Sequence, residues 1–330
     1  MNLKDTHNRT HNYLRISLTD KCNLRCSYCM PHENMQFTPT AQQMNATELL
    51  AITRHFVEAG VDKIRLTGGE PLVRKDIDVI LKGLAQLPVR LAMTTNEVTL
   101  HKHFNLLEET GCTRLNISLD TLNKKRFFEI TRRNNFEQVL ANILEAKKRG
   151  FEIKVNTVLI KGTNDDEVLS LLKFFAKEEI PLRFIEFMPF KDNKWDMSKM
   201  VSEEEILEQV YHEYGKAKTE TLAVADHATA REYKLPKAKV SFGVISSVTN
   251  PFCGSCNRLR LTSDGKLKNC LFSNNEADLL KLFRAGETIT PAVNLLVAKK
   301  HAVRAGMVSA ELFENKDTHQ QNRSMVRIGG

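Results

Sequence analysis

Three cysteines stand close together near the start of the chain, in the stretch "SLTDKCNLRCSYCMP". Cys22, Cys26 and Cys29 have the spacing Cys-x3-Cys-x2-Cys. Three thiolates can hold a [4Fe-4S] cluster by three of its irons, which leaves the fourth iron open for an exogenous ligand. The alternative is a zinc site, because His32 follows Cys29 by three residues and could complete a Cys3His ligand set.

A second trio lies in "NPFCGSCNRLRLTSDGKLKNCLF", at Cys253, Cys256 and Cys270. The Asp-Gly pair inside this stretch predicts a two-residue hairpin turn that pairs "RLRLT" with "KLKNCL" and returns Cys270 toward the other two cysteines. Simple register through that turn places Cys270 opposite Leu259, so the ladder either contains a bulge or ends before Cys270. No histidine lies near this trio, which favours a second iron–sulfur cluster with an open iron over a zinc ribbon.

Arg258 and Arg260 follow soon after Cys253 and Cys256, the first two cysteines of the second trio. They are two residues apart, so on a strand their guanidinium groups project from one face and could bind an anion such as a polyphosphate bidentately. The alternative is that both are solvent-exposed arginines beside a lysine-rich hairpin.

The composition bounds what else the chain can be. Its 330 residues are 42% hydrophobic, and 48 basic against 40 acidic residues give a formal charge of +8. This charge favours an anionic partner or a merely solvated basic surface. No apolar run approaches the roughly 18 residues that span a bilayer, and the polar start lacks the apolar core of a secretory signal. We therefore expect a cytoplasmic protein with no membrane or nucleic-acid partner. The seventh cysteine, Cys112, lies in a buried-strand pattern and is interpreted as structural.

Short β-rich runs alternate with amphipathic helical segments over the first two thirds of the chain. Six runs, "YLRISLT", "DKIRLTG", "VRLAMTT", "TRLNISL", "EIKVNTVL" and "LRFIEFM", are separated by helical patterns such as "ATELLAITRHFVEAG". This alternation predicts an α/β fold with a parallel sheet, interpreted as a partial (β/α)6 TIM-type barrel, with a doubly wound sheet as the alternative. In either fold the loops at the C-terminal ends of the strands hold the chemistry, and the first trio lies on such a loop.

The composition changes near residue 190, where a polar, linker-like stretch begins. We expect a first domain over residues 1–190 and a smaller α+β domain over residues 191–330. Asn164 with Glu167, and Ser202 with Glu205, have the spacing of capping boxes that open helices.

The first trio resembles the cluster-binding loop of the radical S-adenosylmethionine (SAM) superfamily, because an aromatic residue precedes its last cysteine and "TGGEP" follows the second strand. Gly68 and Gly69 let a backbone approach a ligand closely, and Glu70 adds an acceptor for a methionyl ammonium group. The resemblance implies that SAM chelates the open iron. It also implies contacts to SAM from a set of matched positions: Tyr28, Gly69, Ser118 and Met188.

A narrower resemblance extends over nearly the whole chain. The motifs "RLTGGEPL", "KVNTVLIKG", "LRFIEFMPF", "CGSCNRLRLTSDGKLKNCLF" and a final "IGG" are similar to those of the GTP 3′,8-cyclase family. The resemblance implies a lyase that converts GTP to (8S)-3′,8-cyclo-7,8-dihydroguanosine 5′-triphosphate in the first step of molybdenum cofactor (molybdopterin) biosynthesis. The residues implied in GTP binding are Arg15, Arg65, Thr94, Lys154, Arg258 and Arg260. One departure is Glu97, where the family commonly has glycine.

The same resemblance implies two [4Fe-4S] clusters, SAM and a radical mechanism in which the ribose 3′ hydrogen is removed and C3′ attacks C8 of guanine. Gly329, Gly330 and Arg15 are assigned to catalysis, because a Gly-Gly end can enter a narrow site where a Cβ would collide. Expected partners are GTP, an external electron donor, the downstream cyclic pyranopterin monophosphate synthase and a second copy in a homodimer. Two alternatives stay open: another radical SAM enzyme with an auxiliary cluster, such as a peptide-modifying one, and a non-catalytic iron–sulfur electron carrier, which would need closed four-cysteine clusters.

Overall fold

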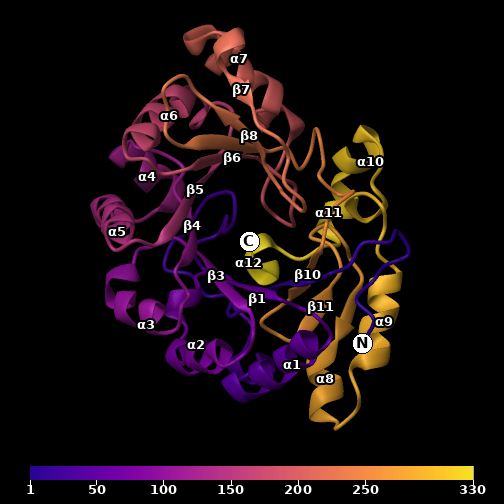
Figure 1. Cartoon of the computed structure of the whole chain (residues 1–330). Helices are drawn as coiled ribbons and strands as arrows, with labels where there is room; N and C mark the ends of the chain where they lie inside the picture. Colours follow the sequence, from indigo (N-terminus) through magenta and orange to yellow (C-terminus); the bar gives the residue numbers. More distant parts are fainter. Residues whose placement is uncertain (330) are drawn as a thin grey trace.

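The computed structural model describes residues 1–329, except that the side chains of residues 310 and 316 are not described. One twelve-stranded sheet curves around the centre of the molecule, in the order β12-β11-β10-β1-β2-β3-β4-β5-β6-β9-β8-β7 (Figure 1). The six predicted strands are all present, and successive strands pair in parallel. Their bounds are β1 (Tyr13–Ser17), β2 (Lys63–Thr67), β3 (Arg90–Thr95), β4 (Arg114–Ser118), β5 (Glu152–Leu159) and β6 (Leu182–Glu186).

Helices follow these strands and form the outer layer seen around the strands in Figure 1. The sheet is not closed, so the arrangement is the predicted partial TIM-type barrel. The bounds of these helices are α1 (Ala46–Glu58), α2 (Ile77–Ala85), α3 (Phe104–Glu109), α4 (Lys124–Thr131), α5 (Phe136–Lys148) and α6 (Val168–Lys177).

The C-terminal part of the chain extends the sheet at both edges. Strand β9 pairs in parallel with β6, and β10 pairs in parallel with β1, so eight parallel strands surround the barrel interior. The remaining strands are β7 (Glu220–Thr221), β8 (Arg231–Lys234), β9 (Ser241–Ile245), β10 (Arg258–Leu261), β11 (Lys266–Lys268) and β12 (Glu276–Asp278). The remaining helices are α7 (Glu203–Tyr214), α8 (Leu279–Arg284), α9 (Thr290–Ala298), α10 (Ala310–Glu314), α11 (Lys316–Gln320) and α12 (Met325–Ile328).

Short 3-10 helices connect several of these elements: η1 (Thr40–Gln42), η2 (Pro71–Val73), η3 (Leu100–Lys102), η4 (Asp165–Glu167), η5 (Met197–Lys199), η6 (Lys216–Lys218) and η7 (Arg304–Gly306). Among residues 1–329, none of the helices combines the length and the apolar character that a bilayer span requires.

The two faces of the barrel strands differ in chemistry. On β1, Leu14 and Ile16 are fully buried in the apolar core, whereas Arg15 alternates with them. Side chains alternate between faces along a strand, so the apolar set packs under the helices and the polar set faces the interior. The same alternation on β2 buries Ile64 and Leu66 in the core. The barrel interior is consequently lined by polar side chains and can hold a polar ligand.

One predicted capping box is confirmed and the other is wrong. Ser202 accepts from the backbone N–H of Glu205, whose carboxylate accepts from the N–H of Ser202. Asn164 makes no such contact. Its amide instead donates to the carbonyl of Asp120, and the carboxylate of Glu167 accepts from the N–H of Leu122. Both side chains therefore tie the end of β4 to the β5–α6 connection, a long-range role that local spacing does not reveal.

The register of the hairpin between Cys256 and Cys270 also differs from the prediction. Thr262 and Lys266 flank a three-residue turn with Gly265 at φ +71°, and Arg260 pairs with Lys268. A glycine in the left-handed region is what a three-residue hairpin loop requires. This shift by one residue places Cys270 level with Arg258 rather than opposite Leu259, and the ladder ends at Lys268.

Candidate active site in the barrel interior

The first cysteine trio faces a cavity at the C-terminal ends of the barrel strands. Cys22, Cys26 and Cys29 lie on the loop after β1 and line a cavity of about 190 Å³. Loops that follow the other strands complete the wall. The structure brings all four predicted SAM contacts to this cavity: Tyr28, Gly69, Ser118 and Met188.

The glycines of "TGGEP" allow two loops to meet backbone to backbone. The N–H of Gly69 donates to the carbonyl of Thr19 over 2.7 Å. A Cβ on Gly69 would overlap the carbonyl oxygen of Lys21 and lie 2.8 Å from that of Asp20. Gly68 has φ +146° and is equally close to the cysteine loop. The glycines thus hold the "TGGEP" segment, residues 67–71 and here called the cradle, against the loop that carries the trio.

Glu70 is fixed at the wall of the same cavity. Its carboxylate accepts from the N–H of Leu72 (3.1 Å), the hydroxyl of Thr95 (2.8 Å) and the N–H of Asn96 (2.7 Å). Burial raises the pKa of Glu70 to about 7, although these hydrogen bonds act in the opposite direction. A rigid, buried carboxyl at this position is suited to accept a hydrogen bond from a cationic ligand.

Asp120 is a site residue that sequence reasoning missed. It lines the cavity, where the Tyr28 hydroxyl donates to one carboxylate oxygen over 2.7 Å and the N–H of Val158 donates to the other over 2.8 Å. Burial raises the pKa of Asp120 to about 6. Its position two residues after Ser118, at the C-terminal end of β4, was the available signal.

The three cysteines are partly buried, and their thiols lie close enough to interact electrostatically with one another. Burial raises the pKa of Cys22 to about 11 and that of Cys29 to about 12. Burial also raises the pKa of Cys26, with further contributions from Asp120 and the other two thiols. Such thiols ionise readily only when a metal centre binds them.

The donor set fits a three-cysteine cluster loop. The N–H of Leu24 and the side-chain amide of Asn96 both approach the Cys22 sulfur at 3.4 Å, as expected for hydrogen bonds to a ligand sulfur. The zinc alternative finds less support, because His32 is exposed.

The second trio lines a smaller cavity of about 80 Å³ together with Arg258 and Arg260. The backbone N–H of Arg304 approaches the Cys253 sulfur at 3.5 Å. Burial alone would raise the pKa of Cys256, but the charges of Arg258 and Lys300 lower it to about 6. Burial raises the pKa of Cys253. The structure therefore brings three cysteine sulfurs and two arginines to one wall of the barrel.

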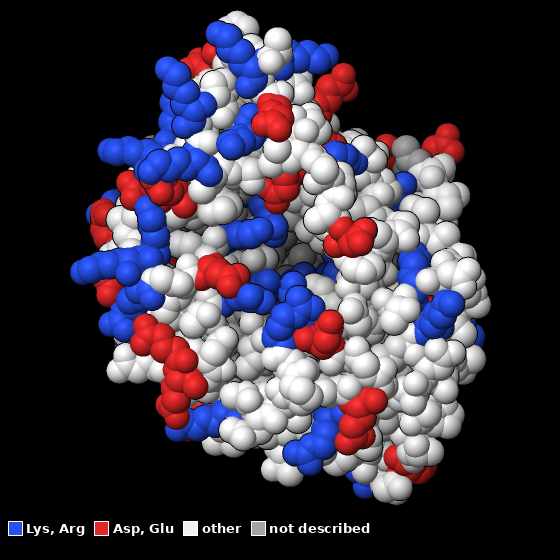
Figure 2. All heavy atoms as spheres, in the orientation of Figure 1, with Lys and Arg blue, Asp and Glu red and all other residues white. Residues whose placement is uncertain are grey.

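A basic cavity of about 340 Å³ lies at the N-terminal ends of the barrel strands. Arg15, Arg65 and Arg258 line it, as the predicted anion site requires. Arg258 also lines the cavity of the second trio, so the two cavities share a wall. In the orientation of Figure 1, lysine and arginine side chains lie to the left of and below the central hollow, and acidic side chains lie above it and to its right (Figure 2).

This cavity is also lined by basic residues that were not predicted from the sequence. Lys63, Arg90 and Arg183 line it. Each stands near the start of a barrel strand, so period-2 alternation along β2 and β6 was the signal available for Lys63 and Arg183. Burial would raise the pKa of Tyr13, but Arg65, Arg15 and Lys63 lower it to about 8. The cavity is thus strongly positive and suited to a polyanion.

The last two predicted anion ligands have different surroundings. Burial lowers the pKa of Lys154, as do the nearby charges of Arg183, Lys63 and Arg65, so Lys154 belongs to the basic cluster. Thr94 instead lines the cavity of the first trio.

The C-terminal segment ends between the two cysteine sites. Gly329 is buried, and its carbonyl accepts from the Arg260 guanidinium over 2.7 Å. A Cβ on Gly329 would overlap the Thr67 hydroxyl and lie 2.9 Å from Ser17 Cβ, and its φ of +85° favours glycine. Only glycine fits at this position. Gly330 lies outside the described residues.

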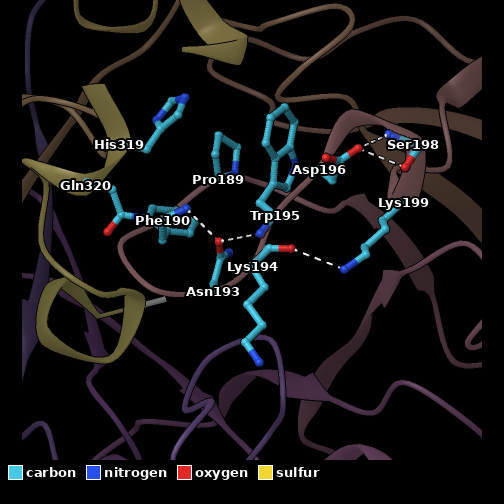
Figure 3. Close-up of a pocket in the computed structure, with 10 residues that line it drawn as sticks. All are labelled: Pro189, Phe190, Asn193, Lys194, Trp195, Asp196, Ser198, Lys199, His319 and Gln320. Carbon is cyan, nitrogen blue, oxygen red and sulfur yellow. Dashed lines mark hydrogen bonds between the residues drawn. The ribbon is translucent and has the colours of Figure 1, made fainter. Parts of the chain in front are cut away.

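A larger cavity of about 450 Å³ lies elsewhere, between the loop after β6 and α11 (Figure 3). There the Asn193 side chain accepts from the N–H groups of Phe190 and Trp195, each over 3.2 Å, and so fixes the loop. Among residues 1–329, none of the site residues predicted from the sequence line this cavity. The active-site candidate is therefore the barrel interior, where cysteines, glycines and arginines converge.

Comparisons with known proteins agree with this geometry. Residues 16–175 match the Radical SAM superfamily, and residues 180–305 match the Molybdenum Cofactor Synthesis C family. A solved structure of Streptococcus suis SuiB bound to S-adenosylmethionine shares the fold, with a TM-score of 0.64 at 16% identity over 97% of this chain and 78% of that one. Fold and cysteine loop together define a radical SAM protein, a class that implies SAM and an iron–sulfur cluster.

Two curated relatives show to which family of radical SAM proteins the chain belongs. The GTP 3′,8-cyclase of Peptoclostridium acidaminophilum is 44% identical over 99% of this chain and 98% of its own length. Molybdenum cofactor biosynthesis protein 1 of Mus musculus is 42% identical over 99% of this chain and 51% of its own. The chain thus spans about half the length of the first curated relatives that it matches. The chain belongs to the GTP 3′,8-cyclase family.

Proposed function

We propose that the chain is a radical SAM lyase that converts GTP to (8S)-3′,8-cyclo-7,8-dihydroguanosine 5′-triphosphate, the first step of molybdenum cofactor biosynthesis. This proposal rests on one observation: the basic cavity, the cavity of the second trio and the cradle of the first trio adjoin one another in the barrel interior. Arg258 belongs to both the basic cavity and the cavity of the second trio, while Gly329 lies between Arg260 and the cradle of the first trio. A nucleoside triphosphate can therefore reach all three features at once.

The first trio and its cradle are assigned to a cluster and SAM. Cys22, Cys26 and Cys29 would hold the cluster. When bound there, the cluster and SAM would supply the radical chemistry that removes a hydrogen atom from the ribose. The carboxyl of Glu70 is placed to accept a hydrogen bond from a methionyl ammonium group. Further contacts to SAM are assigned to the residues that line the same cavity, Tyr28, Gly69, Ser118, Asp120 and Met188.

The second trio and the basic cavity are assigned to GTP. Cys253, Cys256 and Cys270 would hold a second [4Fe-4S] cluster, whose open iron would bind the guanine edge. The basic cavity would hold the triphosphate, since guanidinium groups bind phosphate oxygens bidentately. Residues assigned to this role are Arg15, Arg65, Lys154, Arg258 and Arg260, with Lys63 and Arg183 as additions from the structure and Thr94 at the border with the SAM cavity. In this orientation the ribose links the guanine at the second trio to the triphosphate in the basic cavity, and it has to face the cavity of the first trio for its hydrogen to be removed.

The Gly-Gly end is assigned to catalysis together with Arg15. Gly329 occupies space that no other residue could fill, and it is hydrogen-bonded to Arg260. We infer that this end closes the interior around the ribose and excludes water from a reactive site. Residues 1–190 and 191–330 then act as two functional units, the first for SAM and the second for guanine. An external electron donor, the downstream synthase and a homodimer are the partners that this assignment calls for.

The decisive experiment counts iron and products in anaerobically reconstituted protein. We expect about eight irons, on the premise of one [4Fe-4S] cluster for each trio. Alanine at Cys22, Cys26 and Cys29 should remove half of the iron and all SAM cleavage. Alanine at the second trio should remove the other half and leave some abortive cleavage.

Substrate identity is tested in the same preparation. GTP should stimulate SAM consumption and yield the cyclised nucleotide, whereas peptides should not. Stoichiometric zinc at either trio would overturn the cluster assignment there, and stimulation by a peptide but not by GTP would overturn the proposed reaction.

The role of the C-terminal end has its own test. Deleting Gly329 and Gly330 should preserve iron content and SAM cleavage but stop the transfer of deuterium from C3′ of labelled GTP to 5′-deoxyadenosine. Undiminished transfer by the truncated protein would show that the end has no catalytic role.

A further inference from the structure

Lys300 is a buried cation beside the second trio that the proposed reaction does not use. It follows α9, and only 4% of the residue is exposed. Its ammonium group donates to the carbonyl of Arg258 over 2.8 Å and approaches the Cys256 sulfur at 3.5 Å. The side chain therefore joins the first residue of β10 to a cysteine of the trio.

The charges around Lys300 are unbalanced. A buried ammonium group costs several kcal/mol unless an opposite charge compensates it. No carboxylate within residues 1–329 forms an ion pair with Lys300, and Arg258 and Arg9 add positive charge nearby. The ligand sulfurs of a bound cluster would supply negative charge, and the Cys256 sulfur lies 3.5 Å from the ammonium group. The geometry thus fits a Lys300 that faces an anionic centre held by the trio.

The loop that carries Lys300 is held in place from behind. Arg9 donates to the carbonyls of Cys253 (2.8 Å), His301 (2.7 Å) and Ala302 (2.9 Å), and Asp5 pairs with Arg9 at 2.7 Å. One guanidinium thereby ties the residues after Lys300 to the first cysteine of the trio. The ammonium group is consequently positioned by a rigid framework rather than by its own flexible chain.

We propose that Lys300 is a positioning residue for the second cluster, where its ammonium group donates a hydrogen bond to the Cys256 sulfur and stabilises the more negative, reduced form. This inference rests on the second cluster of the proposed function. Hydrogen bonds to ligand sulfurs and nearby charge set the potentials of iron–sulfur centres. Lys300 should therefore raise the reduction potential of the second cluster. The cluster, with guanine bound to it, would then be reduced more easily than without Lys300.

The test uses the full chain with Cys22, Cys26 and Cys29 replaced by alanine, so that the second cluster alone is observed. Its midpoint potential is measured by anaerobic redox titration followed by electron paramagnetic resonance. The variants are Lys300→Met, which removes charge and donor, Lys300→Gln, which keeps a donor, and Lys300→Arg, which keeps the charge. Lys299→Met, an exposed neighbour, is the matched control. The same titration on the chain with both trios intact tests whether the three alanine substitutions themselves change the potential of the second cluster.

We expect Lys300→Met and Lys300→Gln to shift the one-electron equilibrium toward the oxidised form by threefold to tenfold, where tenfold equals about 59 mV. Lys300→Arg and Lys299→Met should shift it by less than twofold. Equal potentials in all variants would overturn the inference about Lys300 without contradicting the proposed second cluster. Loss of iron from every Lys300 variant would also overturn it, because Lys300 would then serve assembly only. Absence of a cluster from the parent background would instead refute the proposed second cluster itself.

Discussion

Replacing Glu97 by glutamine should change how the stability of the protein depends on pH. Glu97 is fully buried with φ +60°, in the left-handed region that disfavours residues other than glycine. Within the described chain, neither of its carboxyl oxygens has a hydrogen-bond partner. Burial, with a further contribution from the charge of Glu70, raises the pKa of Glu97 well above its usual range. The folded protein therefore favours the neutral acid form of Glu97 more strongly than the unfolded chain does.

The sign and size of the effect follow from this protonation. The unfolded chain releases the proton near pH 4.5, whereas the folded chain retains it. The contribution of Glu97 to stability is therefore complete below the unfolded pKa and is lost as pH rises toward the folded pKa. The loss amounts to about 1.4 kcal/mol for each pH unit in this window. Glutamine has nearly the same shape and no such proton, so Glu97→Gln should gain stability relative to the unmodified protein as pH rises above the unfolded pKa, by up to about 1.4 kcal/mol for each pH unit.

The assay is anaerobic urea unfolding of both proteins at half-unit steps from pH 5 to pH 7.5. The quantity compared is the difference between their free energies of unfolding, because contributions from other groups cancel in it. Glu58→Gln serves as a control, since that side chain is 64% exposed. A difference for Glu97→Gln that stays constant across the whole range would refute the reasoning and show that Glu97 is ionised or solvated when folded.

Three further substitutions test the site. Gly69→Ala should abolish SAM binding while iron content is retained, because its Cβ would overlap the cysteine loop; Gly254→Ala, with open space around it, should bind SAM normally in the same equilibrium dialysis. Arg183→Met should weaken GTP binding by about 1.5–3 kcal/mol in calorimetry and leave guanosine binding unchanged, with the surface residue Arg149 as the control substitution. Arg260→Ala should weaken GTP binding by about 1.5–3 kcal/mol and also reduce deuterium transfer, since Arg260 holds Gly329; normal transfer would contradict that link.

Local patterns were enough to predict the barrel and the meeting of the first trio with the "TGGEP" residues at one cavity. Strand periodicity located all six parallel strands, and the residues after β1 and β2 were correctly expected at one cavity, because parallel strands end at a common edge. Cys112 is fully buried, as its strand pattern predicted. These successes depend on contacts within one strand–helix unit or between neighbouring units.

The failures involve choices between competing partners. Asn164 had the spacing of a cap, but its amide bonds to Asp120 instead, a contact that links two different strand ends. The hairpin before Cys270 has a three-residue turn, since Gly265 alone takes the left-handed conformation. Arg183 was overlooked because period-2 alternation assigns it to one face of β6 but does not show, without the neighbouring strands, that this face lines the basic cavity. Tertiary register decides each of these cases, and a single sequence does not contain it in readable form.

The pairing of β10 with β1 has a consequence for synthesis. Asn12 and Asn257, which join the starts of these strands, are 245 positions apart. At roughly 5–20 residues per second, β1 waits on the order of 12–50 s on the ribosome before its edge is covered. An open strand edge is a template for pairing with other chains. This edge of β1 therefore stays open to other chains during that interval, and the loop with the first three cysteines emerges long before the wall that completes the interior.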